Sequence, residues 1–139
     1  MNVLQKTHVF DTQARQLTNI TSPLQSMVTS SQIQIGLCHV FIQHTSAALI
    51  ITENADPDVL LDLENYLTHL VPDGDPRYLH DAEGSDDMAA HIRSVLTQTE
   101  LSIPITEGRL GLGIWQGVFL YEHRAQTHIR HVIQTLQGQ

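Results

Sequence analysis

Apolar and polar residues alternate near the start of the chain and again toward its end, which is the pattern of half-buried β-strands. Residues 6–10 alternate in this way and residues 15–20 form a second β-like stretch, so the two are expected to pair as an opening hairpin. Residues 33–43 and 47–52 are rich in apolar and β-branched side chains and predict two core strands. Further strands are predicted at residues 101–105, 110–121 and 129–136, with a turn at Glu107 and Gly108.

Helical patterns lie between these strands. Thr21 or Ser22 is the expected cap of a first, short helix that has Pro23 at its first position and ends in the polar residues 29–31. Asp56 followed by Pro57 predicts the start of a second helix. The apolar stripe of this second helix comprises Leu60, Leu63, Leu67 and Leu70, and Pro72 ends it.

A polar segment separates the second helix from a third. Residues 72–84 are rich in Asp, Gly and Pro without periodicity, and loops of that length in small domains are usually functional or disordered. Ser85 or Asp86 is the expected cap of the third helix. Its predicted apolar stripe comprises Met88, Ile92, Val95 and Leu96.

These elements predict an α+β domain of mainly antiparallel sheets with two or three inserted helices, because strands and helices do not alternate regularly. A length of 139 residues without repeats or a linker fits one domain, residues 1–139. Cys38 is the only cysteine, so an internal disulfide and zinc bound by paired cysteines are excluded. Its apolar surroundings predict a buried, inert thiol.

Charge and hydropathy argue against several classes of function. The net charge is −8 and the seven basic residues are scattered singly, which argues against nucleic-acid and membrane-surface binding. The longest aliphatic run, residues 47–51, is far shorter than the ~18 residues of a membrane span, and the first ten residues lack a signal-like stretch. A cytoplasmic protein is therefore expected. Charged residues make up only 16%, which favours an oligomer, since subunit contacts are depleted in charge.

Three of the nine histidines lie where a site could form: His44 at a strand end, His80 in the long loop and His91 early in the third helix. Neutral imidazole is a common zinc ligand, and three protein ligands with one open position typify a catalytic metal site. Each histidine taken alone is more typical of a surface or hydrogen-bonded residue than of a metal ligand. The other six lie on strands or at a helix end and indicate no site.

Carboxylates and hydroxyls crowd the same regions. Glu53 follows an apolar strand, where it could be a general base or simply a solvated turn residue. Thr45 and Ser46 could bind an anion, although a plain turn would use the same residues. The glycine-rich segment 108–117 contains Arg109 and Trp115, which could offer a ligand charge and a flat face, or could form a bulged strand with Trp115 in the core.

Six linked motifs, spread over residues 36–137, resemble the YjbQ family, and its bacterial branch in particular. They are His44-Thr45-Ser46-Ala47, Glu53-Asn54-Ala55-Asp56-Pro57, Val71-Pro72, Tyr78 with His80 and Gly84, Ala90-His91-Ile92, and Gly108-Arg109 with Gly113 and Trp115-Gln116-Gly117. Two positions depart from the pattern: many members carry Asn where this chain has Asp87, and Asp where it has Ala89. An added carboxylate at position 87 would change the charge balance of a metal site.

The resemblance implies a sandwich-like α+β fold, a homotrimer, and a pocket near the subunit interfaces where His44, His80 and His91 hold a divalent metal ion, zinc or magnesium. It also implies a low, secondary thiamine-phosphate synthase activity, with the main substrate undefined.

The first hypothesis is therefore a metal-dependent enzyme acting on a small phosphorylated molecule, as a transferase or a phosphohydrolase. Glu53 and Asp87 are its expected catalytic groups. The expected substrate-binding residues are Thr45, Ser46, Asn54, Arg109, Trp115 and Gln116. The alternatives are a non-catalytic trimer that binds a metal or a phosphorylated metabolite, and histidines that only stabilise the trimer.

Overall fold

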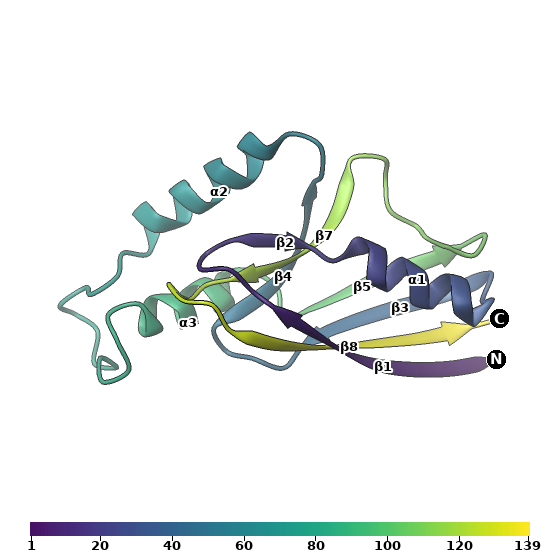
Figure 1. Ribbon diagram of the computed structural model, residues 1–139, viewed down its shortest axis with the longest axis horizontal. Helices are drawn as coiled ribbons and strands as arrows, with labels where there is room; N and C mark the ends of the chain where they lie inside the picture. The colour runs from purple at the N-terminus through teal and green to yellow at the C-terminus, as the bar shows by residue number, and fades with distance from the viewer.

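Two antiparallel sheets and three helices make up the protein in a computed structural model that describes residues 1–139 (Figure 1). The larger sheet has the order β1-β8-β3-β5-β6, and its strands are β1 (Asn2–Asp11), β8 (Ile129–Gly138), β3 (Ile35–Ile42), β5 (Glu100–Thr106) and β6 (Arg109–Leu110). The smaller sheet, β2-β7-β4, contains β2 (Leu17–Asn19), β7 (Gln116–Glu122) and β4 (Ala47–Glu53). The helices are α1 (Thr21–Ser31), α2 (Pro57–Leu70) and α3 (Asp87–Leu96). The prediction of an antiparallel α+β fold is confirmed.

The hydrophobic core lies between α1 and the inner faces of both sheets. Leu24 and Val28 of α1 pack there with Val40 of β3 and Leu120 of β7, and all four are fully buried. Cys38 is a free, buried thiol in the same cluster, as the sequence predicted. Burial raises its pKa, so the thiol is protonated at neutral pH and is a poor nucleophile.

The predicted opening hairpin is wrong. β1 pairs along its whole length with β8, and β2 pairs with β7 in the other sheet. The connection between them is anchored by Thr12, whose N–H donates to the His128 carbonyl and whose hydroxyl oxygen accepts from the His128 N–H. Local alternation identifies a strand, but it does not identify the strand's partner, and here both partners come from the end of the chain.

The predicted strand at 110–121 is in fact two strands. β6 ends at Leu110 and β7 begins at Gln116, and the intervening residues form a turn. The Gln116 side chain accepts a hydrogen bond from the Gly113 N–H (2.7 Å), which closes this turn. The two predicted core strands, by contrast, are confirmed as β3 and β4, although they lie in different sheets.

The helix positions are confirmed, whereas one of the three predicted N-cap positions, that of α1, is wrong. Asp56 caps α2 by accepting from the Asp58 N–H (2.9 Å), as predicted. The residue before α1 is Ile20, and the hydroxyl of Thr21 instead accepts from the N–H of Val118. Asp86 precedes α3 but makes no capping hydrogen bond.

The predicted apolar stripe of α3 is also wrong. Val95 and Leu96 are exposed, and the buried side of the helix carries Asp87, Ala90 and Arg93. Arg93 is fully buried because its guanidinium donates to the carboxylate of Glu64 on α2 (2.7 Å). A polar pairing between helices therefore decides which face of α3 turns inward. None of the three helices combines the length and the hydrophobicity of a transmembrane segment.

Candidate metal site

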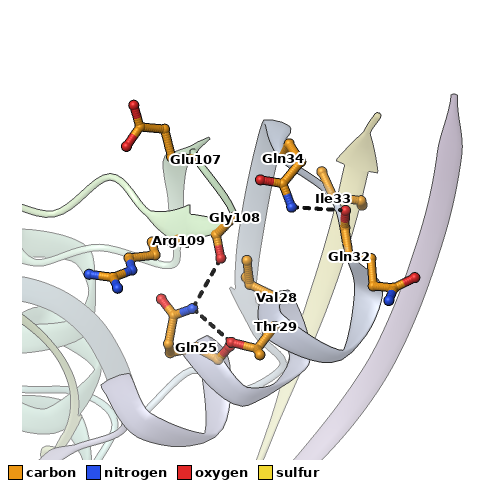
Figure 2. Close-up of a pocket in the computed structure, with 9 residues that line it drawn as sticks. All are labelled: Gln25, Val28, Thr29, Gln32, Ile33, Gln34, Glu107, Gly108 and Arg109. Carbon is orange, nitrogen blue, oxygen red and sulfur yellow. Dashed lines mark hydrogen bonds between the residues drawn. The ribbon is translucent and has the colours of Figure 1, made fainter.

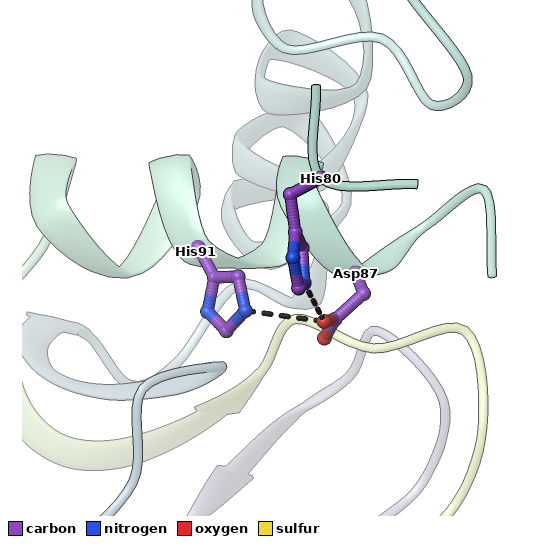
Figure 3. Close-up of side chains that lie close together, drawn as sticks. All are labelled: His80, Asp87 and His91. Atoms are coloured by element: carbon purple, nitrogen blue, oxygen red, sulfur yellow. Dashed lines mark hydrogen bonds and ion pairs between the residues drawn. The ribbon is translucent and has the colours of Figure 1, made fainter. Parts of the chain in front are cut away.

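Two imidazoles and a carboxylate meet at the start of α3 (Figure 3). Asp87 and His91 are four residues apart on that helix and so share one face. His80 reaches them from the loop before it. The Nε2 atoms of His80 and His91 lie 2.7 Å and 3.1 Å from the same Asp87 oxygen, Oδ2. Three ligand atoms within 4.8 Å of one another match the donor set of a three-ligand metal site.

The hydrogen bond at the far side of His91 determines how its ring can act. Nδ1 lies 2.9 Å from the backbone carbonyl oxygen of Thr45, which can only accept, so Nδ1 carries the proton. In the neutral ring, Nε2 then presents a lone pair to the Asp87 carboxylate. Two lone pairs at 3.1 Å repel, and the arrangement is stable only with a cation, either a proton or a metal ion, beside Nε2. Metal-binding histidines commonly donate their other N–H to a carbonyl in this way.

The electrostatics of the cluster favour an ionised carboxylate. Burial alone would raise the pKa of Asp87, whose side chain is only 3% exposed, but its hydrogen bond with His80 and the charges of His91 and Arg124 outweigh burial, and the pKa is lowered. The same hydrogen bond raises the pKa of His80. The site therefore holds a negative charge that attracts either protons or a metal ion.

His44 does not join this cluster, so the predicted set of three histidines is not what the chain brings together. Its Nε2 accepts from the backbone N–H of His131 (2.8 Å), and its ring stacks on the ring of His131. Its Nδ1 faces the Arg130 guanidinium at 3.3 Å. Burial and Arg130 lower the pKa of His44. The lone pair of His44 is committed to a backbone amide, and the third member of the cluster within the chain is Asp87, which the sequence predicted as a catalytic group.

Thr45 and Ser46 adjoin the cluster but differ in availability. Thr45 is exposed beside His91, so its hydroxyl is free to bind a ligand. Ser46 is buried, and its hydroxyl accepts from the Arg130 guanidinium at 3.0 Å. An open hollow of about 460 Å³ lies over this segment and reaches Phe41 and Thr99. Of the two predicted anion-binding hydroxyls, the structure leaves that of Thr45 available.

The other predicted groups of β4 and β7 gather at the opposite end of β4. Glu53 accepts from the N–H groups of Ala55 and Asp56 (2.9 and 2.7 Å), so its carboxylate shapes the turn before α2. Asn54 donates to the carbonyls of Ile114 and Gln116. Seven residues of strand, about 20 Å, separate this end from the cluster of His80, Asp87 and His91. The carboxylate of Glu53 does not reach the cluster within one chain.

The glycine-rich segment also lies away from the cluster. Trp115 is 60% exposed rather than in the core, and it stands beside Asn54 at this far end of β4. Arg109 borders a groove of about 550 Å³ between the C-terminal end of α1 and the turn at Glu107 and Gly108 (Figure 2). This end of α1 and helix α3 lie at opposite ends of the molecule (Figure 1).

Sequence comparisons identify related proteins. The family described as UPF0047 protein YjbQ-like matches residues 5–139. The chain is 56% identical over 131 residues to UPF0047 protein sll1880 of Synechocystis, covering 94% of this chain and 89% of that protein. It is 41% identical over 136 residues to UPF0047 protein YjbQ of Escherichia coli O157:H7, covering 97% and 98%.

Solved structures show the same architecture. A YjbQ/UPF0047 protein of Clostridium acetobutylicum is 32% identical with a TM-score of 0.82, covering 91% of this chain and 97% of that one. A protein of unknown function from Sulfolobus solfataricus has a TM-score of 0.85 at 22% identity over 99% and 100% of the two chains, and it supports the fold alone. The sequence relationships and the shared fold together place the chain in the YjbQ (UPF0047) family.

Proposed function

We propose that the chain binds a divalent metal ion through His80, Asp87 and His91 and acts there on a small phosphorylated molecule. The proposal depends on the Nδ1 hydrogen bond of His91 to the Thr45 carbonyl. This bond turns the Nε2 lone pair toward the Asp87 carboxylate, and a cation between the two would stabilise the arrangement. Two imidazoles in a set of three ligands favour zinc over magnesium, because magnesium prefers oxygen ligands. A low thiamine-phosphate synthase activity is the reaction that the family resemblance implies for this site.

The residues around the cluster support binding of a phosphate. A bound ion with an open position would polarise a phosphoryl oxygen or activate water. The exposed hydroxyl of Thr45 stands next to His91 and can donate to a phosphate oxygen. The Nδ1 hydrogen bond to the Thr45 carbonyl fixes the ring of His91, so its Nε2 faces a ligand in a fixed direction.

The metal content of untagged protein tests the proposal. We expect about one zinc-class ion per chain in the parent protein and its loss in His80→Ala, Asp87→Ala and His91→Ala, because each change removes one of three ligands. His44→Ala is the matched control and should retain the ion, since the His44 ring is committed to Arg130 and His131. Elemental analysis after dialysis against each metal measures this.

Two outcomes would contradict the metal site. A parent protein that takes up no ion under any loading condition would remove the basis for metal chemistry. Loss of the ion in His44→Ala, with the fold intact by circular dichroism, would assign the site to a different ligand set.

A non-catalytic, ligand-binding role is the second candidate. It is favoured by the position of Glu53, whose carboxylate is engaged in a turn about 20 Å away from the cluster. Phosphate binding without turnover of any phosphorylated substrate by the metal-loaded protein would support this role.

The outer face of the larger sheet supports the proposal of a homotrimer. No helix covers this face, and its exposed apolar residues include Val3, Val9, Ile35, Leu37 and Phe41. Glu100 and, at the rim, Asp11 are the only acidic residues that β1, β3, β5 and β8 place there. The four long strands span roughly 600 Å², near the ~800 Å² per partner of a stable interface. In a protein with a net charge of −8, a surface nearly free of charge suits contact with a second copy.

Introducing charge on this face should dissociate the assembly. We expect Leu37→Glu to convert trimers to monomers in sedimentation velocity, because the new carboxylate would be desolvated between subunits. Gln13→Glu adds the same charge in an exposed connection and should leave the trimer intact. An unchanged sedimentation coefficient for folded Leu37→Glu would exclude this face as the contact.

A further inference from the structure

We propose that Arg124 is a positioning residue that orients Asp87 for the metal ion, an inference that rests on the proposed function. Arg124 lies in the turn directly after β7, distant in sequence from the cluster. Its Nη1 lies 3.0 Å from Asp87 Oδ1, whereas the two histidines approach the other oxygen, Oδ2. The carboxylate is therefore held by one oxygen and presents the other to the site.

Arg124 also fastens the segment that leads into α3. Its Nε donates to Asp86 Oδ2 at 2.8 Å, and its Nη2 donates to the backbone carbonyl of Glu83 at 3.1 Å. With Asp87, these contacts tie three positions around the helix start to one guanidinium that is only 16% exposed. His80 stands in the same loop, so the contacts restrict its position as well as that of Asp87.

Local backbone geometry accommodates this arrangement. Gly84 has φ +102°, a backbone conformation that residues with a side chain rarely adopt. A Cβ at this position would lie 3.0 Å from Asp86 Oδ1. Glycine therefore lets the loop turn closely enough for Glu83 to present its carbonyl to Arg124. The planar guanidinium has five donors in a rigid fork, and a lysine ammonium could not keep the three contacts in these directions.

The charge of Arg124 suits the same role. Asp87 is almost fully buried, and a buried carboxylate requires a compensating positive charge and hydrogen-bond donors. Arg124 places the positive charge 3.0 Å from the oxygen that points away from the histidines. Without Arg124 the carboxylate could rotate, and either oxygen would face the metal ion. Groups that orient metal ligands in this way typically change metal affinity 10- to 100-fold.

Cobalt binding tests the role, since the visible spectrum of bound Co²⁺ reports ligand geometry. We expect Arg124→Gln to weaken Co²⁺ binding about 10- to 100-fold and to alter the spectrum, and Arg124→Lys to recover part of the affinity through its charge. Arg77→Gln is the control, because Arg77 belongs to the same loop but pairs only with Asp75. Wild-type affinity and spectrum in folded Arg124→Gln would overturn the inference while leaving the metal site intact.

A metal-free measurement separates this inference from the proposed function. In chelator, we compare thermal unfolding of Arg124→Gln, Asp87→Asn and the double variant. Directly coupled groups give non-additive shifts, so the double variant should lose clearly less than the sum of the two single changes. Additive shifts would overturn the coupling. If the parent protein bound no cobalt, the proposed metal chemistry would fail, and this cycle would still decide whether Arg124 holds Asp87.

Discussion

Glu122→Gln is expected to lower the free energy of unfolding by about 3–5 kcal/mol, because it leaves the buried guanidinium of Arg130 without its counter-charge. Glu122 is fully buried and Arg130 is 4% exposed. The Arg130 Nε donates to Glu122 Oε1 at 2.8 Å, and Nη2 donates to Oε2. Thr12 donates its hydroxyl to Oε1 and Arg124 its backbone N–H to Oε2, so the carboxylate accepts four hydrogen bonds.

The pair is well compensated in the folded protein. Burial alone would raise the pKa of Glu122, but the hydrogen bonds from Arg130 and Thr12 outweigh it and the pKa is lowered. A carboxamide offers one acceptor oxygen and brings an NH₂ group toward a cation. The same pair anchors the segment beside His91, since Arg130 also donates to the carbonyl and hydroxyl of Ser46.

Chemical denaturation at pH 7 measures this effect. Asp73→Asn is the control, because its partner Arg15 forms a similar contact at the surface, where such pairs contribute at most about 1 kcal/mol. Adding Arg130→Met to Glu122→Gln should restore much of the loss, since it removes the unpaired buried charge. Equal stabilities of Glu122→Gln and Asp73→Asn would contradict the prediction.

His123 should make the protein sensitive to mild acid. It is fully buried, its Nδ1 has no hydrogen-bond partner, and its ring lies against that of Tyr121 at 4.4 Å. Burial, followed by the charge of Arg93, lowers its pKa from 6.5 to about 3. At a pH between these two pKa values, His123 is protonated in the unfolded chain but neutral in the folded chain. Stability is therefore lost as the pH falls below about 6.5, by about 2 kcal/mol between pH 7 and pH 5.

The pH window separates His123 from the acidic groups. Asp86, Asp87 and Glu122 have lowered pKa values, so their contribution is lost only below their unfolded values, under about pH 4.5. His44 has the same sign as His123, while His80, with a raised pKa, has the opposite sign. Both remain present in a variant of His123.

Denaturation in chelator at pH 7 and pH 5 therefore tests this directly. His123→Phe keeps a ring against Tyr121 and should remove about 2 kcal/mol of the acid-induced loss. His69→Gln on exposed α2 is the control and should lose as much stability as the parent. A His123→Phe protein with the parent's full pH dependence would show that His123 is not the responsible group.

Local patterns determined much of the fold. The Asp56–Pro57 start and the spacing of the leucines located α2, and the apolar runs located β3 and β4, because capping and hydrophobic periodicity act over a few residues. The sequence pointed to His80 and His91 as neighbours in one candidate site, and the fold brings them together. The four-residue spacing of Asp87 and His91 was a signal for the third member of the cluster.

Only the tertiary structure decided which strands pair and which distant side chains are in contact. β1 pairs with β8 and not with its neighbour along the chain, because a strand's alternation does not identify its partner. The inward face of α3 follows the Arg93–Glu64 pair. His44 contacts Arg130 and His131 and not the cluster of His80, Asp87 and His91, and Arg124 reaches Asp87 from the turn after β7. Each of these contacts joins residues far apart in the sequence, so only the folded chain brings their charges and lone pairs together.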